Sequence, residues 1–391
     1  MNTKSVEPAQ EGTFHFPDHE PFRLEAGGEL QPVSLRYAVY GTLNPKPDNV
    51  VLVCHALSGA ARVADWWNDM FAPGRPFDLS RYCVIGTNVL GSCYGSTGPT
   101  SINPRTGIAY GPDFPLITVG DMVRAQARLL DHLGVERVHS VIGGSIGGMQ
   151  ALQWAIEFPD RVQACVAIGA TPVSAMALAL NHIQRLAIQS DANWNGGRYT
   201  PDAAPTTGLG IARAIAMCSY KSAELLTKRF ARRPNRDGDD PYRSPEGRFD
   251  VAGYLDYQRA EFNSRFDANT YITISKAMDV FDLERSYGSE KSAFARILAR
   301  VLMIGISTDW LFPPGDVRAF TARMQAVGVR ARYVELVSSH GHDGFLADVG
   351  ALSDVIKSHD DWLSARPALH PHSDGERLAR PASASSRLDF A

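Results

Sequence analysis

Short apolar runs recur along the chain and alternate with segments of helical periodicity. Runs of four to eight apolar residues are typical of strands that are buried on both faces of a parallel sheet. They lie at residues 50–54, 82–86, 138–142, 162–168, 301–306 and 332–337. Apolar and polar residues alternate between Thr13 and Asn44, which predicts antiparallel strands before the first of these runs. The pattern predicts an α/β fold with a mostly parallel central sheet.

Helical patterns fill the gaps between the strands. Thr118 and Asp121 have the spacing of a capping box, and the helix that follows them is expected to end at Gly134. A second helix is predicted from Gly147 to Phe158, where Pro159 ends it. Strands that alternate with helices in this way form right-handed crossovers in one sheet.

One long segment breaks this alternation. Residues 171–291 are rich in helix formers, and a polar, proline-containing stretch at residues 232–248 is expected to be a solvated loop. We interpret the segment as a helical lid inserted between two strands. The predicted parts are a flexible leader (1–12), a catalytic domain (13–170 and 292–365), the inserted helical lid (171–291) and a disordered tail (366–391).

Composition narrows the function classes. A length of 391 residues would on average correspond to two or three domains, but the pattern favours one domain with an insertion. The formal net charge of −3 argues against a nucleic-acid partner, and no apolar stretch is long enough for a membrane span. Five scattered cysteines without a C-x-x-C pair fit a reduced, cytoplasmic enzyme better than a disulfide scaffold or a zinc site.

The first candidate for chemistry is a serine between a predicted strand and a predicted helix. Residues 143–147 read Gly-Gly-Ser-Ile-Gly, the G-x-S-x-G pattern of a nucleophile elbow. Small residues are needed around Ser145 because the turn is sharp and a Cβ atom would clash. A passive serine in a glycine-rich turn is the alternative interpretation.

A base and an orienting acid follow in the order that such a sheet requires. Asp309 comes directly after the run at 301–306, and His342 comes directly after the run at 332–337. Ser145, Asp309 and His342 are therefore the predicted catalytic triad. His340 competes with His342 for the role of base, a metal site at the two histidines lacks a third ligand, and Asp309 could be a strand cap.

An oxyanion hole completes the predicted machinery. One backbone N–H is expected from Ile146, the residue after the nucleophile, and the other from Leu57 in the loop at residues 54–59. Otherwise this loop is an ordinary connection in which His55 packs locally. These residues alone predict a serine acyl-transfer enzyme of the α/β-hydrolase type.

Longer strings carry a family resemblance. They lie at residues 54–57, 88–99, 143–152, 265–271 and 341–346. Together they resemble the homoserine O-acetyltransferase family, over about residues 13 to 360. The resemblance implies transfer of acetyl from acetyl-CoA to the hydroxyl of L-homoserine through an acyl-serine, in methionine biosynthesis, with no cofactor and no metal.

The resemblance also assigns substrate contacts. In the family, a lid arginine and the acid after the histidine contact the amino acid, and these positions match Arg213 and Asp343. It further implies a homodimer formed through the helical lid. Arg259 and Glu261 depart from the family, which usually has Gly and then Lys at these two positions.

Three alternatives remain at this stage. A relative could use succinyl-CoA or L-serine, since one methylene changes binding by only about 1–3 kcal/mol. A serine ester hydrolase would let water attack the acyl-serine. A non-catalytic binding protein would be favoured by an incomplete triad.

Overall fold

The computed structural model describes residues 5–17, 19–236, 238 and 240–365. An eight-stranded sheet forms its centre, in the order β1-β4-β6-β5-β7-β8-β9-β10. The strands are β1 (Gln10–His15), β4 (Ser34–Tyr40), β5 (Val50–Cys54), β6 (Cys83–Thr87), β7 (Val138–Gly144), β8 (Val162–Ile168), β9 (Arg300–Ile306) and β10 (Ala331–Leu336). From β6 to β10 neighbouring strands run parallel, whereas β1 and β4 are antiparallel to their neighbours. The predicted fold class is confirmed.

Several boundaries differ from prediction by one to three residues. The strand β7 extends to Gly144, and β9 and β10 each begin one residue before their predicted runs. The run predicted at residues 82–86 is β6, which starts one residue later because Cys83 is the first residue to pair with Val50. The first strand, β1, starts at Gln10, inside the segment predicted as a leader. Just before it, the backbone N–H of Val6 donates a hydrogen bond to Asn68 at 2.9 Å. The first strand therefore begins before the predicted boundary at residue 12, while residues 1–4 and the tail predicted at 366–391 lie outside the described residues.

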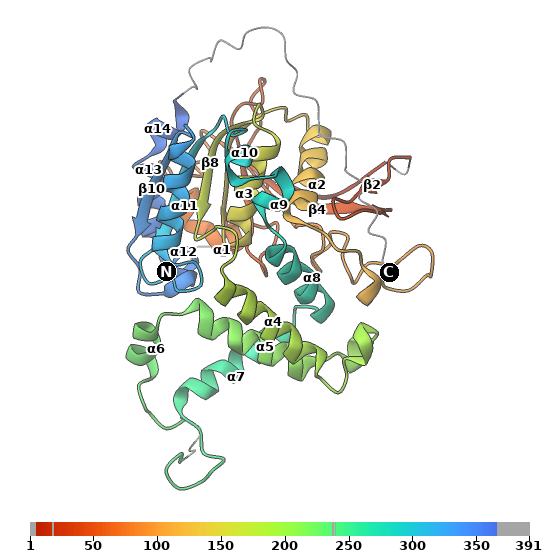
Figure 1. Cartoon of the computed structure of the whole chain (residues 1–391), viewed down its shortest axis with the longest axis vertical. Helices are drawn as coiled ribbons and strands as arrows, with labels where there is room; N and C mark the ends of the chain where they lie inside the picture. The colour runs from red at the N-terminus through yellow and green to blue at the C-terminus, as the bar shows by residue number, and fades with distance from the viewer. Residues whose placement is uncertain (1–4, 18, 237, 239, 366–391) are drawn as a thin grey trace.

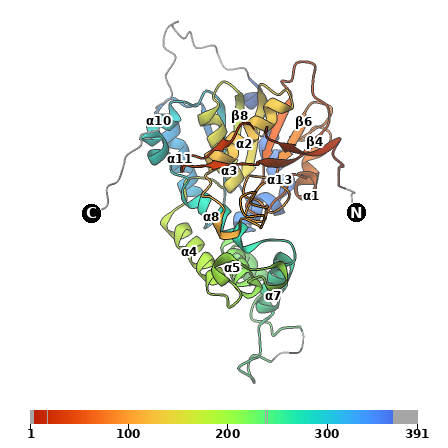
Figure 2. The same ribbon diagram turned by 90° about the vertical axis from the view of Figure 1, so that its right-hand side faces the viewer.

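Helices cover both faces of the sheet (Figures 1 and 2). In β5, Val50, Leu52 and Cys54 belong to the core cluster under α2 (Val119–His132), α3 (Ile146–Glu157) and α11 (Pro314–Ala326). Val51 and Val53 belong to the opposite cluster, under α1 (Ala64–Trp67), α13 (Val349–Lys357) and α14 (Asp360–Ser364). Alternate residues of one strand thus enter two cores, which explains its uninterrupted apolar run.

Between β8 and β9 the chain leaves the sheet. The helices α4 (Ala175–Gln189), α5 (Thr206–Tyr220), α6 (Ala223–Phe230) and α7 (Asp250–Asn263) lie below it in Figure 1. The chain then returns through α8 (Ala268–Asp279), α9 (Leu283–Tyr287) and α10 (Glu290–Phe294). Tyr271 and Ile274 of α8 share the core of α2 and α3, so this helix packs on the sheet domain.

The remaining elements are short. They are β2 (Phe22–Arg23), β3 (Glu29–Leu30), α12 (Gly344–Ala347) and the 3₁₀ turns η1 (Asn68–Phe71), η2 (Gly111–Asp113), η3 (Asn195–Gly197), η4 (Pro201–Ala203) and η5 (Gly341–Asp343). Within the described ranges, no helix has both the length and the apolar character needed to cross a bilayer.

Candidate active site

Ser145 occupies a strained turn at the carboxyl end of β7. Its φ of 59° and ψ of −129° lie outside the regions that L-residues ordinarily adopt. Such a conformation costs about 1–3 kcal/mol and marks functional turns. The backbone N–H of Ser145 donates to the carbonyl of Ile168 at 2.9 Å, which ties the turn to β8. The serine is thus held at the end of the sheet with 7% of its surface exposed.

Two glycines beside Ser145 are required by close backbone contacts. A Cβ atom at Gly147 would lie 2.1 Å from the carbonyl oxygen of Cys54, and one at Gly143 would lie 2.3 Å from the carbonyl carbon of Gly147. Real Cβ atoms do not approach backbone so closely. The glycines therefore allow β7, α3 and the loop after β5 to meet beneath the serine, as the motif predicts.

Asp309 and His342 form a buried pair at the same end of the sheet. The Nδ1 atom of His342 lies 2.7 Å from Oδ2 of Asp309, and the side chains are 3% and 0% exposed. The other carboxylate oxygen of Asp309 accepts from the backbone N–H groups of Leu311 and Phe312, both at 2.9 Å. A carboxylate can only accept, so the proton of the neutral imidazole lies on Nδ1 and Nε2 keeps its lone pair.

Three aromatic rings surround the His342 imidazole. Phe312 stacks on it with 5.2 Å between ring centroids, Phe345 meets it edge-on at 5.5 Å, and Tyr220 lies at 5.8 Å. The buried Nε2 atom has no hydrogen-bond partner among the residues that the structure describes. Leaving a buried nitrogen without a hydrogen-bond partner costs free energy of folding, and a catalytic role is one explanation for such an atom. Nε2 is therefore available as a base.

Opposing effects set the pKa of His342. Burial by itself would lower the pKa, but the charge of Asp309, its hydrogen bond to Nδ1 and the charge of Asp343 all raise it. The balance is a pKa above the ordinary value of 6.5 for histidine. A raised pKa makes the imidazole a stronger base, provided that the pH is high enough to deprotonate it.

Ser145 and two of the rings around His342, Tyr220 and Phe312, line one small cavity. Ser145, Leu57, Tyr220 and Phe312 line a space of about 10 Å³, at the junction of the sheet domain with α4 and α5. Such a volume holds roughly one water molecule. A substrate can therefore enter only if lining side chains or lid helices move.

The predicted oxyanion donors lie beside this cavity. Ile146 is the first residue of α3, so its N–H has no acceptor within the helix. Leu57 lines the cavity together with Ser145. The loop that carries Leu57 is held by His55, whose Nδ1 donates to the Ala56 carbonyl at 2.7 Å and whose Nε2 accepts from the Val89 N–H at 3.1 Å. Burial lowers the pKa of His55 to about 4, so this ring stays neutral and structural.

The two residues assigned to the substrate have different surroundings. Arg213 extends from α5 with its guanidinium 4.8 Å from the ring centroid of Phe262, and its buried Nε has no hydrogen-bond partner within the described chain. Asp343 forms an ion pair with Lys221, with 2.8 Å between Oδ2 and Nζ. Sequence reasoning missed Lys221, since nothing in its local pattern distinguishes it from a solvated lysine.

The two departures from the family pattern lie on α7. Arg259 pairs with Asp256 at 3.1 Å and packs against α5, where a Cβ atom at Gly210 would lie 2.9 Å from its Nε. Glu261 is exposed. Arg259 therefore packs between α7 and α5, the helix that carries Arg213.

His340 has a carboxylate partner of its own. The Nδ1 atom of His340 lies 2.9 Å from Oδ2 of Asp348, apart from the pair that Asp309 forms with His342. In the part of the chain that is described, no three His, Cys, Asp or Glu side chains gather as a metal site requires.

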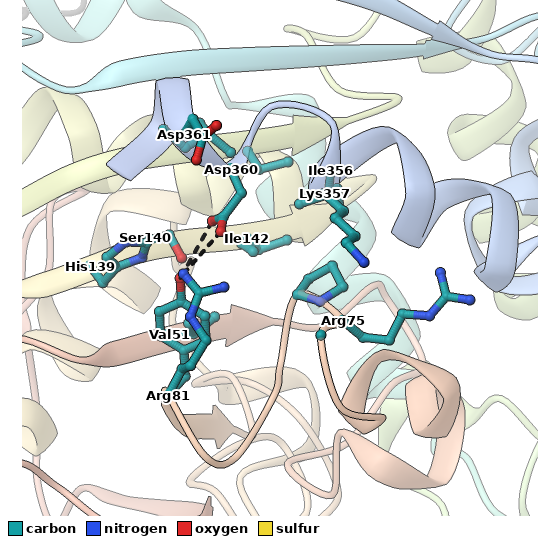
Figure 3. Close-up of a pocket in the computed structure, with 15 residues that line it drawn as sticks. Val51, Arg75, Arg81, His139, Ser140, Ile142, Ile356, Lys357, Asp360 and Asp361 are labelled. Carbon is teal, nitrogen blue, oxygen red and sulfur yellow. Dashed lines mark hydrogen bonds and ion pairs between the residues drawn. The ribbon is translucent and has the colours of Figure 1, made fainter. Parts of the chain in front are cut away.

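Three larger cavities do not contain Ser145, and one of them, of about 560 Å³, is lined by residues 29–32, 103–105, 110, 113 and 115. Another of about 580 Å³ lies between the start of α5, the start of α8 and the loop around η2. The third, of about 320 Å³, lies near the amino ends of β5 and β7 (Figure 3). Two of the charged side chains that line it, Arg81 and Asp360, pair with each other at 2.9 Å. Ser145 instead lines the small cavity at the opposite, carboxyl end of the strands.

Comparison with known proteins agrees with this geometry. The family described as the alpha/beta hydrolase fold matches residues 49–348. The homoserine O-acetyltransferase of Symbiobacterium thermophilum is 47% identical, covering 86% of this chain and 91% of its own length. That of Solidesulfovibrio magneticus is 44% identical, covering 86% and 88%.

Solved structures of a homoserine O-acetyltransferase and of an esterase superpose on this chain. The homoserine O-acetyltransferase from Bacillus anthracis superposes with a TM-score of 0.83 at 27% identity, covering 93% of this chain and all (100%) of that one. Esterase E22 superposes with a TM-score of 0.82 at 26% identity, covering 89% and 99%.

Proposed function

Because the chain belongs to the α/β-hydrolase fold family and, within it, to the homoserine O-acetyltransferases, we propose that it transfers acetyl from acetyl-CoA to the hydroxyl of L-homoserine. As a member of this family, the chain is an acyltransferase. The observation that carries the mechanism is the buried His342–Asp309 pair, whose free Nε2 lies at the end of the sheet where Ser145 sits on its strained turn.

In the first half-reaction, Nε2 of His342 takes the proton of the Ser145 hydroxyl as its oxygen attacks the thioester carbon. The negative charge that develops on the thioester oxygen is stabilised by the N–H groups of Leu57 and Ile146. When the tetrahedral intermediate collapses, the carbon–sulfur bond breaks and His342 returns the proton to the CoA thiolate. Acetyl-Ser145 remains, and Asp309 keeps the imidazole oriented throughout.

In the second half-reaction, His342 takes the proton of the acceptor hydroxyl, whose oxygen attacks the acetyl carbon. Collapse breaks the bond to Oγ of Ser145, which regains its proton from His342. Arg213, which has no carboxylate partner among the described residues, holds the acceptor carboxylate, and Asp343 accepts its ammonium. Because CoA leaves before the acceptor reacts with acetyl-Ser145, the reaction is ping-pong.

The chain's own groups suffice for these steps, so no cofactor or metal takes part and acetyl-CoA is a co-substrate. The enzyme works in the cytoplasm, in the synthesis of methionine.

An ester hydrolase is the second candidate, because an esterase shares the fold. Transfer is favoured because the homoserine O-acetyltransferases are 44–47% identical to this chain, whereas the esterase is 26% identical. Purified protein is tested with acetyl-CoA or succinyl-CoA and with L-homoserine or L-serine, while CoA release is followed. We expect fast release with acetyl-CoA and L-homoserine. Equal release without any acceptor would indicate a hydrolase, and a preference for another pair would reassign the substrates.

The pH dependence follows from the raised pKa of His342. A base works only when unprotonated, so kcat/KM for acetyl-CoA should fall at acid pH with a midpoint above 6.5. The charge of Asp343 contributes to the raised pKa, so Asp343→Asn should move this midpoint to lower pH. The measurement is the pH profile of CoA release in the first half-reaction, which needs no acceptor.

Asp360→Asn is the control for this profile, because Asp360 lies at the opposite end of the strands (Figure 3). Its midpoint should match that of the unmodified enzyme. A midpoint below 6.5 in the unmodified enzyme, or one that Asp343→Asn leaves in place, would contradict this assignment of charges around His342.

The lid also supports a homodimer. Large apolar side chains on α4 are exposed, among them Met176 at 60%, Ile183 at 47% and Leu186 at 51%. Apolar groups of this size gathered on one helix mark interaction surfaces. Light scattering of the purified chain should give twice the chain mass of 42.6 kDa, and a monomer mass would contradict the proposal.

A further inference from the structure

The carboxylate assigned to the substrate ammonium is already occupied by a cation of the chain itself. Nζ of Lys221 lies 2.8 Å from Oδ2 of Asp343, and the two side chains are only 15% and 18% exposed. An ammonium at hydrogen-bond distance from a carboxylate is the contact that an amino-acid acceptor would make there. Lys221 thus holds the place of the substrate's own ammonium group.

Arg213 and Lys221 differ in their partners. Lys221 pairs with Asp343, whereas Arg213 has no carboxylate partner among the described residues. The guanidinium of Arg213 lies 6.0 Å from the ring centroid of Tyr220. Burial raises the pKa of the Tyr220 phenol, the charge of Arg213 lowers it and the charge of Asp343 raises it, so both groups act on this ring. An acceptor carboxylate would supply the partner that Arg213 lacks.

The volume of the cavity at Ser145 also indicates that side chains must move before an acceptor binds. The cavity at Ser145 has about 10 Å³, and Tyr220, the residue before Lys221, forms part of its wall. An amino acid cannot enter until side chains there move. Moving Lys221 away from Asp343 costs free energy unless its ammonium finds another anion, because both groups are mostly buried.

We propose that Lys221 is a specificity-determining residue that selects zwitterionic acceptors by exchanging ion pairs with them. The acceptor ammonium takes the place of Lys221 on Asp343, and the acceptor carboxylate binds Lys221 together with Arg213. An acceptor with only one of the two charges leaves either Lys221 or Asp343 unpaired and binds poorly. This inference rests on the proposed function and adds a residue that distinguishes acceptors by their charged groups.

The contacts that fix this part of the backbone do not use the Lys221 side chain. The Trp310 indole N–H donates to the carbonyl of Lys221 at 3.2 Å, and the hydroxyl of Ser222 donates to the carbonyl of Ser339. Replacing the side chain therefore tests its charge while the lid stays attached to the loop of His342.

The experiment compares three primary alcohols that differ in the charged groups they carry. L-homoserine carries both charges, 3-aminopropan-1-ol lacks the carboxylate, and 4-hydroxybutanoate lacks the ammonium. Each is assayed with acetyl-CoA against the unmodified enzyme, K221M and K221Q. In both variants we expect kcat/KM for L-homoserine to fall about tenfold, mainly through KM, because the acceptor carboxylate loses a partner. For 3-aminopropan-1-ol it should rise, because Asp343 is free to bind an ammonium.

K228M is the matched control, since Lys228 is an exposed lysine on α6, and it should leave all three values unchanged. A parallel change for the three acceptors in K221M and K221Q would show a structural role and overturn the proposal, as would no change. K221Q keeps a hydrogen-bonding group beside Asp343 and carries the test if K221M does not fold. Failure of the unmodified enzyme to acetylate L-homoserine would instead refute the proposed function.

Discussion

Replacing Ser145 with alanine should lower the rate of acetyl transfer by about five to six orders of magnitude, the loss expected when a triad nucleophile is removed. No other hydroxyl is positioned on the strained turn beside the cavity, within the residues described. The variant loses the atom that forms the acyl-enzyme, while the oxyanion donors and His342 remain. The measurement is CoA release from acetyl-CoA in the presence of L-homoserine.

The control for this variant is Ser190→Ala, because Ser190 is an exposed serine at the end of α4. It should retain full activity. Thermal unfolding of Ser145→Ala should stay close to that of the unmodified chain, because the change removes one oxygen without creating a large cavity. Substantial CoA release by a folded Ser145→Ala would show that the acceptor attacks the thioester directly.

Replacing Asp309 with asparagine should lower kcat by about four orders of magnitude, even though the shape is kept. Oδ1 of Asp309 accepts from the N–H groups of Leu311 and Phe312, so the amide oxygen of asparagine would take that position. Its NH₂ group would then face Nδ1 of His342, which lies 2.7 Å from Oδ2 in the unmodified chain. Nδ1 would have to accept, the proton would move to Nε2, and the base would be lost.

Asp348→Asn provides the comparison, because it alters the equivalent pair of the neighbouring histidine. Asp348 lies 2.9 Å from His340 and makes no hydrogen bond with His342 among the described residues. Its activity should fall far less than that of Asp309→Asn. If the two variants lost activity equally, the loop as a whole rather than the tautomer of His342 would be responsible.

Much of the sheet could be predicted because burial on both faces leaves a strong local signal. The strands β5 and β8 match their predicted bounds, since every apolar residue of each run enters one of the two cores. The capping box is also present, with the Thr118 hydroxyl accepting from the Asp121 N–H at 3.1 Å. These features depend on neighbours in sequence.

Features that depend on distant packing could not be predicted. The bounds of α7 within the predicted lid are one example, because its buried residues are Asp250 and Phe262, too few to show a helical period. The Lys221–Asp343 pair joins the end of the lid to the loop after β10, and neither local sequence indicates the other. The order of Ser145, Asp309 and His342 was readable, because each follows a strand whose carboxyl end must lie at the same edge of the sheet.

The most direct test of the mechanism is to look for acetyl-Ser145. The enzyme is mixed with acetyl-CoA without an acceptor, quenched rapidly, digested and analysed by mass spectrometry. The account predicts a burst of one CoA per active site and an acetyl group on the peptide that contains Ser145, which disappears when L-homoserine is added before the quench. CoA release that requires L-homoserine, with no acetyl group on Ser145, would contradict it.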